Sequence, residues 1–273
     1  MAVVPFPDPH KSEVDPRREG SEPDESDSDP DRMSFLDHLD ELRTRLIYSL
    51  LSLGVGVFVA FFFIDRIYDF VMRPLQQMLP PGGHLIYTQA PEAFMLYLRM
   101  ALIAGIVLAA PLIMWQVWLF VAPALYQKER RFAIPFVVLA SAGFIGGAAF
   151  SHYVVFPLMW RFFAGFSSDV VTFMPRIEDA FGLYIRMLLG MALVFQMPSV
   201  VFFLAKMGVV TARWMLRYVK YAVLLIFIVA AVITPSADMA TQTIVAVPMI
   251  GLYLISIAIA WMFGKKKNPS QEL

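Results

Sequence analysis

Cysteine is absent from this chain of 273 residues, so it can form no disulfide, thiolate metal site or cysteine nucleophile. Other catalytic signatures are missing too. No glycine-rich loop is followed by Lys and Ser or Thr, which excludes the usual cradle for ATP phosphates. Two histidines at metal-ligand spacing and a Gly-x-Ser-x-Gly elbow are also lacking. We therefore expect no metal, no cofactor and no enzymatic activity.

Charge is scarce, and its spacing is informative. Only 16% of the residues are charged while 59% are hydrophobic, and the mean hydropathy is +0.64. A helix needs about 20 apolar residues to cross a bilayer core. Six windows of 17 to 29 residues carry no charge: 46–64, 100–127, 132–160, 187–205, 221–237 and 239–264. These uniform runs exclude the alternating strands of a β-barrel and predict an all-α, polytopic membrane protein with six transmembrane helices.

The net charge of zero hides two oppositely charged parts. Residues 1–32 hold ten acidic and four basic residues and are rich in Pro and Ser. This composition predicts a disordered, solvated tail, with an acidic tail that binds a specific partner as the alternative. The tail is no secretory signal, because it lacks a basic start and an apolar core. We divide the chain into this tail, a membrane domain 33–264 and a short basic tail 265–273.

The basic residues predict the orientation. Six spans put both termini on one side of the membrane. That side carries twelve Lys and Arg residues, against six on the other side or at its span edges, Arg99 and Arg186 among them. The positive-inside rule therefore places both termini in the cytoplasm.

Connections and helix breakers are uneven along the chain. Residues 65–93 and 161–179 are long outside loops, expected to lie along the surface as partly ordered caps. The fifth window rises only about 25 Å, less than the hydrocarbon thickness. Gly143 and Gly147 form a GxxxG spacing, which predicts close helix packing within the protein. Prolines, although common in membrane helices, are expected to kink the spans into a concave bundle: Pro111, Pro123, Pro135, Pro157, Pro198, Pro235 and Pro248.

A few polar groups lie within or beside the windows. The Gln196 amide, in the middle of the fourth window, needs a partner, and the carbonyl near Val194, freed by Pro198, is one candidate. Structural and functional roles for Gln196 both stay open. Glu92 and Arg99, seven residues apart, can share an interior helix face. His152 is better explained as a satisfied, aromatic-like side chain than as a ligand or proton relay.

The segment Ser34–Leu46 runs into the first window and is amphipathic. Its apolar residues recur at helical spacing, which predicts a helix at the membrane surface with Ser34 as its N-cap. Glu41 has a local explanation, an i,i+4 pair with Arg45. Glu129, an acid among three cations after the second span, has one too, because it offsets its neighbours' charge.

Ordered motifs over roughly 230 residues resemble TatC, the polytopic subunit of the twin-arginine protein translocase. The matching segments are Phe35–Leu46, Arg73–Leu75, Pro91–Phe94, Pro111–Leu112, Gln116–Tyr126, Glu129–Arg131, Val155–Leu158, Phe195–Pro198, Thr234–Pro235, Asp238 and Gln242. The resemblance implies a receptor and scaffold subunit in the bacterial inner membrane. Such proteins bind twin-arginine signal peptides of folded precursors at the cytoplasmic face and assemble with single-span TatA- and TatB-like partners. Transport is driven by the protonmotive force.

The resemblance also implies roles for individual residues. Signal-peptide binding carries over to Leu39, Glu41, Arg43 and Glu129. Of these, the two carboxylates on one surface suit the two guanidinium groups of the signal peptide. Interior polar or partner contacts carry over to Glu92, Gln196, Asp238 and Gln242. Structural roles carry over to Pro74, Phe120, Pro123, Pro198, Pro235 and Pro248. We further expect a homo-oligomer within a larger complex, contact with membrane lipid and no nucleic acid.

Two positions depart from the family's pattern. Gln196 stands where many members have Glu, and an amide cannot titrate, so we do not expect it to relay protons. Leu254 stands where the family often has an acid. The main alternative function is a small secondary transporter with a midplane site of Gln196, Glu92 and Arg99. We see none of the internal repeats typical of such transporters between residues 46–131 and 187–264. An intramembrane enzyme is a more distant alternative, because catalytic groups are lacking.

Overall fold

The computed structural model describes residues 35–77, 79, 84–121, 133–168, 173–234 and 238–264. The chain divides into two compact units, Met1–Glu41 and Leu42–Leu273. Several predicted features lie outside the described residues and stay predictions: the tails 1–32 and 265–273, Ser34, Pro123, Glu129 and Pro235.

The described segments are almost entirely helical and contain the six predicted spans. Five helical stretches are long and apolar enough to cross a membrane: His38–Phe62, Glu92–Val121, Ile134–Ala164, Ile177–Met207 and Met239–Phe263. They correspond to α1 (Phe35–Phe62), α3 (Glu92–Val121), α4 (Ala133–Phe150) with η3 (Ser151–Val155) and α5 (Phe156–Ala164), α6 (Ile177–Val194) with α7 (Met197–Met207), and α10 (Met239–Phe263). The remaining span, α9 (Val219–Ile233), is the fifth in chain order and is shorter, as predicted from its window.

The connections between the spans hold more helix than the sequence analysis assigned. Residues 65–93 were predicted as a loop, but α2 (Ile64–Gln76) fills the first part of it. One face of α2 is buried, with Val71, Met72 and Leu75 in the core. Pro74 is also buried and lies within the last turn, where the carbonyl left without a donor is close to the helix end. A second short helix, α8 (Ala212–Arg217), begins at Thr211, whose hydroxyl accepts a hydrogen bond from the Trp214 amide.

Two prolines mark breaks in otherwise continuous spans. Pro198 stands in the first turn of α7, after the Phe195–Gln196 turn that ends α6. Pro157 stands in the first turn of α5, directly after the π-helical residues of η3. Proline is tolerated at these positions because the first turn of a helix needs no internal donor. By contrast, α3 and α10 run on through Pro111 and Pro248.

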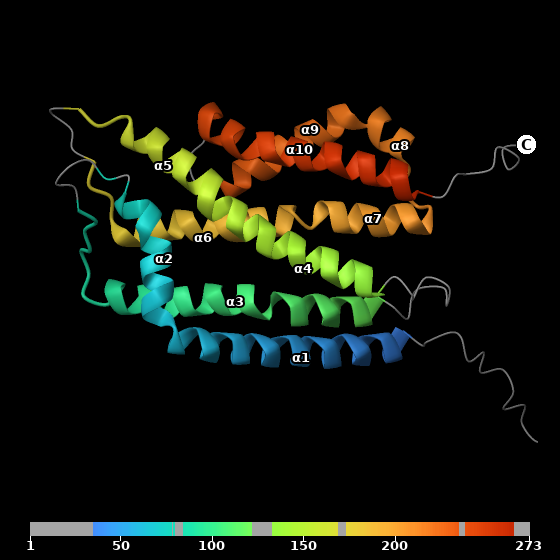
Figure 1. Ribbon diagram of the computed structural model, residues 1–273, viewed down its shortest axis with the longest axis horizontal. Helices are drawn as coiled ribbons and strands as arrows, with labels where there is room; N and C mark the ends of the chain where they lie inside the picture. The colour runs from blue at the N-terminus through green and yellow to red at the C-terminus, as the bar shows by residue number, and fades with distance from the viewer. Residues whose placement is uncertain are drawn as a thin grey trace, which may run out of the picture. The chain divides into compact units, whose positions relative to one another are not determined.

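Small residues bring the helices of the second unit close together. In Figure 1, α4 runs obliquely from the end of α3 across α6, and α10 packs beside α7. A Cβ atom at Gly143 would lie 2.9 Å from the Phe195 carbonyl oxygen, and one at Gly147 would lie 2.7 Å from that of Met191. Both distances are too short for a side chain, so the GxxxG prediction of close internal packing is confirmed. Around this contact the core is rich in methionine, with Met100, Met187 and Met191 fully buried.

Candidate functional site

The predicted signal-peptide segment lies at the start of α1, and its helical structure is confirmed. In the first unit, Leu39 is 44% exposed, Asp40 is exposed and Glu41 is partly buried. Arg43 belongs to the second unit and is exposed. Because Glu129 lies outside the described residues, a common site of Glu41 and Glu129 stays a prediction.

Gln196 forms a hydrogen bond to a neighbouring helix. Its Nε2 donates to the Ala140 carbonyl oxygen of α4 at 3.0 Å, and a longer contact of 3.5 Å reaches the Ala192 carbonyl oxygen. The predicted partner, the carbonyl near Val194, was therefore wrong. The close approach of α4 at Gly143 brings a different carbonyl within reach of the amide. This bond explains how a polar side chain is accommodated in the middle of a span, and any partner role for Gln196 stays a prediction.

Asp238 forms the N-cap of α10. Its carboxylate accepts hydrogen bonds from the Thr241 amide at 2.8 Å and from the Thr241 hydroxyl at 2.7 Å. The Asp238 carbonyl oxygen accepts the Gln242 amide at 3.3 Å, while the Gln242 side chain is partly buried. The Asp-x-x-Thr spacing is a sequence signal for this N-cap, and the family resemblance alone had implied only an interior or partner contact for Asp238.

Glu92 is the centre of a network of charges where α3 and α6 begin. Glu92 is 6% exposed, and its carboxylate accepts hydrogen bonds from the Thr88 amide and hydroxyl, each at 3.1 Å. Arg176, just before α6, donates to it at 2.6 Å. The Glu92 carboxylate also raises the pKa of the Arg176 guanidinium, so this arginine stays charged. An isolated bridge between Ile86 and Arg176 joins the backbones of the two connections.

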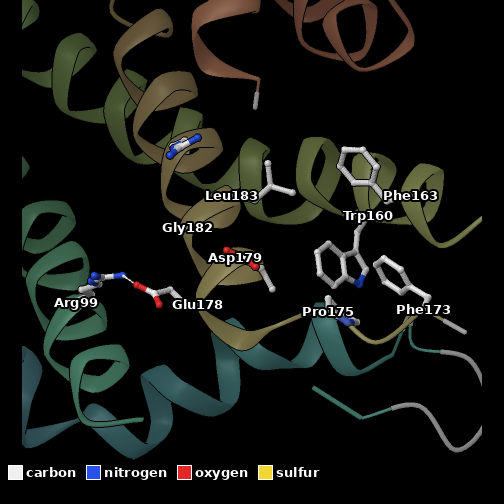
Figure 2. A pocket seen from close by; sticks show the side chains of 11 residues that line it. Arg99, Trp160, Phe163, Phe173, Pro175, Glu178, Asp179, Gly182 and Leu183 are labelled. Carbon is white, nitrogen blue, oxygen red and sulfur yellow. Dashed lines mark hydrogen bonds and ion pairs between the residues drawn. The ribbon is translucent and has the colours of Figure 1, made fainter. Parts of the chain in front are cut away.

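Arg99 also contacts the start of α6. Its guanidinium donates to Glu178 at 3.2 Å, as Figure 2 shows, and Glu178 lies 3.7 Å from Arg176. Glu92 and Arg99 therefore face the same neighbouring segment, but at a helix end and not in the middle of the bundle. Gln196 bonds to α4 instead, so these three residues do not form the site that a transporter would need.

Other predicted residues that the structure describes lie within the helices, and their structural roles stay predictions. Pro198 is buried, and Phe120 of α3 and Pro248 of α10 are partly buried. His152 stacks on Phe70 at 4.1 Å between ring centroids, and its Nδ1 lies 3.0 Å from the Tyr184 hydroxyl. The prediction of a satisfied, aromatic-like histidine is thus confirmed. Within the described ranges, no three His, Asp or Glu side chains gather as a metal ion would need.

Comparisons with known proteins agree on one family. The family model described as Sec-independent protein translocase protein (TatC) matches residues 37–248. A protein of that name from Desulforapulum autotrophicum is 41% identical over 242 residues, covering 89% of each chain. One from Koribacter versatilis is 41% identical over 247 residues, covering 88% of this chain and 91% of the relative.

Solved structures extend this likeness to the fold. The crystal structure described as twin arginine translocase receptor TatC in DDM has a TM-score of 0.74 and 31% identity. The match covers 84% of this chain and all of that one. Family, relatives and fold give no support to the transporter alternative, and they coincide with the ordered motifs found in the sequence. The chain therefore belongs to the TatC family and is a subunit of the twin-arginine protein translocase.

Proposed function

We propose that this chain is the receptor subunit that binds twin-arginine signal peptides of folded precursor proteins at the cytoplasmic face. Glu41 and Glu129 receive the two arginines. The observation that carries the proposal is the position of Glu41 near the start of α1, in the first turn of the stretch His38–Phe62 that can cross the membrane, beside the exposed Leu39 and Asp40.

The chemistry of the proposed contact follows from the shape of the groups. A guanidinium presents paired N–H donors that match the two oxygens of a carboxylate, whereas a lysine ammonium is a point charge. At the membrane edge the local dielectric is lower than in water, which strengthens such pairs. In the same proposal Leu39 provides an apolar contact for the signal peptide, and Arg43 orders the acids around it.

The proposal includes assembly in the bacterial inner membrane, with both termini cytoplasmic and the protonmotive force as the driving force. TatA- and TatB-like helices pack against this chain, and further copies of it join the complex. Much apolar helix surface is available for them, because only 11% of the first span is buried inside the structure. Among the predicted partner contacts Gln242 is the best supported, since the carboxylates of Glu92 and Asp238 already have partners within the chain.

Charge reversal at the two acids tests the receptor function. Glu41→Lys and Glu129→Lys should each lower photo-crosslinking of an Arg-Arg signal peptide to membrane vesicles at least about tenfold. Charge-assisted hydrogen bonds are worth about 1.5–3 kcal/mol, which corresponds to such a loss. A Lys-Lys signal peptide should crosslink weakly even to the unchanged protein. Asp40→Lys is the matched control, because it adds the same charge on the same turn. Undiminished crosslinking in both variants would refute the proposal.

A further inference from the structure

A pocket of about 530 Å³ lies beside the start of α6, and the proposed receptor function does not use it. One part of its wall is charged, with Arg99 from α3 and with Glu178, Asp179 and Arg186 from α6. Another part is apolar and aromatic, from Trp160, Phe163 and Phe173. Figure 2 shows the labelled aromatic rings to one side of Asp179 and the Arg99–Glu178 pair to the other. The volume is in the range of small-molecule sites.

The charged side chains of this pocket are not all used within the protein. Arg99 and Glu178 pair with each other. Within the described part of the chain, neither Asp179 nor Arg186 forms an ion pair or a side-chain hydrogen bond, and both are exposed. The charge of Asp179 acts on the Arg176 guanidinium without a direct contact, so the pocket offers a ligand the Arg186 cation and an Asp179 carboxylate with free hydrogen-bonding capacity.

The position of Arg186 makes a counter-charge important. This residue lies about 13 Å along α6 from Ile177, and Arg99 lies about 10 Å along α3 from Glu92, at roughly 1.5 Å per residue. Both helices are membrane spans, and both arginines stand at the edge of an uncharged window. An arginine on a membrane span is costly unless it reaches the interface or meets an anion. Arg99 has Glu178, whereas Arg186 has no anion of its own in the described structure.

We propose that this pocket binds the phosphate head of a phospholipid from the leaflet in which α3 and α6 begin. Arg186 binds the phosphate oxygens, a role to which the planar guanidinium is suited. Asp179 binds an ammonium carried by the same head. Phe163 and Phe173, which line the pocket and are only partly buried, contact the apolar part of the lipid, as aromatic side chains do at membrane interfaces.

A lipid explains the site better than a charged segment of a partner protein does. The pocket opens beside membrane spans, where lipid is always present. Its four charged side chains, Arg99, Arg186, Glu178 and Asp179, sum to zero, which suits a zwitterionic head and not a strongly acidic or basic peptide. The mixture of paired charges with aromatic rings matches a molecule that is polar at one end and apolar at the other.

Native mass spectrometry of the purified full-length protein in detergent tests this site. The probes are a phosphatidylethanolamine, a phosphatidylglycerol and a diacylglycerol with the same chains, and excess inorganic phosphate. Arg186→Gln removes the charge, and Gly182→Leu fills the pocket, where a Cβ atom meets nothing within 4 Å. Leucine also favours a helix more than glycine does, so the second variant should fold. Arg161→Gln is the control, an exposed arginine of α5 that does not line the pocket.

The expected result is a first bound phosphatidylethanolamine that both pocket variants lower at least about fivefold and that Arg161→Gln leaves unchanged. Diacylglycerol should bind weakly, and inorganic phosphate should not displace the lipid. Unchanged lipid binding in a folded Gly182→Leu protein would overturn the proposal. Displacement by phosphate alone would overturn it in favour of a free anion. Equal binding of diacylglycerol, or much stronger binding of phosphatidylglycerol, would show unspecific attraction instead. None of these outcomes depends on signal-peptide binding.

Discussion

In the middle of the bundle α4 meets α6 backbone against backbone, whereas α3 and α6 meet at their starting ends through ion pairs. At the first contact two glycines leave room for carbonyl oxygens of the facing helix, and a single side-chain amide crosses between the helices. At the second, Glu92, Arg99, Arg176 and Glu178 connect the helix starts.

The difference follows from the surrounding solvent. Within hydrocarbon, apolar side chains gain little by leaving the lipid, so helices are held by close van der Waals packing and a few hydrogen bonds. At a helix end near the interface, water solvates charged side chains before they pair. Oppositely charged side chains on two helices can therefore hold the helix ends together. Each region should therefore be sensitive to a different kind of substitution.

The largest effect should come from Gly147→Leu. Its side chain would begin 2.7 Å from the Met191 carbonyl oxygen, which is fixed in the α6 backbone, so the helices must separate. We expect a loss of about 3 kcal/mol in the free energy of unfolding, measured by denaturant unfolding in detergent. Gly146→Leu is the control, because a Cβ atom there meets nothing within 4 Å. Equal losses in the two variants would show that the contact is not specific.

Glu92→Gln should have the next largest effect, at the other contact. It removes the partner at 2.6 Å from Arg176 and leaves that arginine with Glu178 at 3.7 Å. We expect a clear fall in the thermal unfolding temperature, greater than for Arg99→Gln. The double variant Glu92→Gln with Arg176→Gln should be less destabilised than the two single changes added together, because the pair is coupled. Additive losses would contradict the pairing.

Gln196→Leu should have a smaller effect in the middle of the bundle. It removes the hydrogen bond to Ala140 but leaves the packing of α4 on α6 in place. Hydrogen bonds between membrane helices are worth about 0.5–1 kcal/mol, and denaturant unfolding should show a loss of that size. A loss as large as that of Gly147→Leu would mean that the amide, and not the close packing, holds these helices.

Arg99→Gln should have the smallest effect. Both partners of its ion pair are about half exposed, with side-chain exposures of 47% and 40%. Such pairs contribute about 0.2–1 kcal/mol, and added salt weakens them further. Thermal unfolding at low and high salt should differ only slightly between this variant and the unchanged protein. A large loss that does not change with salt would place the pair in a drier setting than its exposure indicates.

The sequence predicted the spans well because each depends on local composition. The windows bounded by Arg99 and Lys128, or by Lys220 and Asp238, are apolar enough to be recognised without any knowledge of contacts. The amphipathic α2 was not predicted, because uncharged windows indicate only apolar helices, whereas α2 contains Asp65, Arg66 and Arg73. Its apolar residues recur at helical spacing, and that signal was available.

The contacts across the chain were not accessible in the same way. Glu92 and Arg176 are 84 positions apart, and the residues next to each of them in the sequence do not indicate that the two side chains pair. The acceptor of Gln196 was predicted from local chemistry, the missing donor of Pro198, but the amide bonds instead to a helix 56 positions away. Such pairings depend on how helices cross, which composition does not determine.

The π-helical turn Ser151–Val155 also has a consequence for the phase of its helix. The buried positions from α4 through α5 recur every four residues, at Ala148, His152, Phe156 and Trp160. In a regular α-helix four residues turn about 400°, so a stripe of period four would drift by roughly 40° per repeat and leave the core. The wider π turn takes up one extra residue and returns the stripe to the same side. Deleting a single residue within this turn should therefore restore a regular α-helix and leave Trp160 on the core side, because the eleven remaining steps from Ala148 turn about 1,100°, close to three full turns.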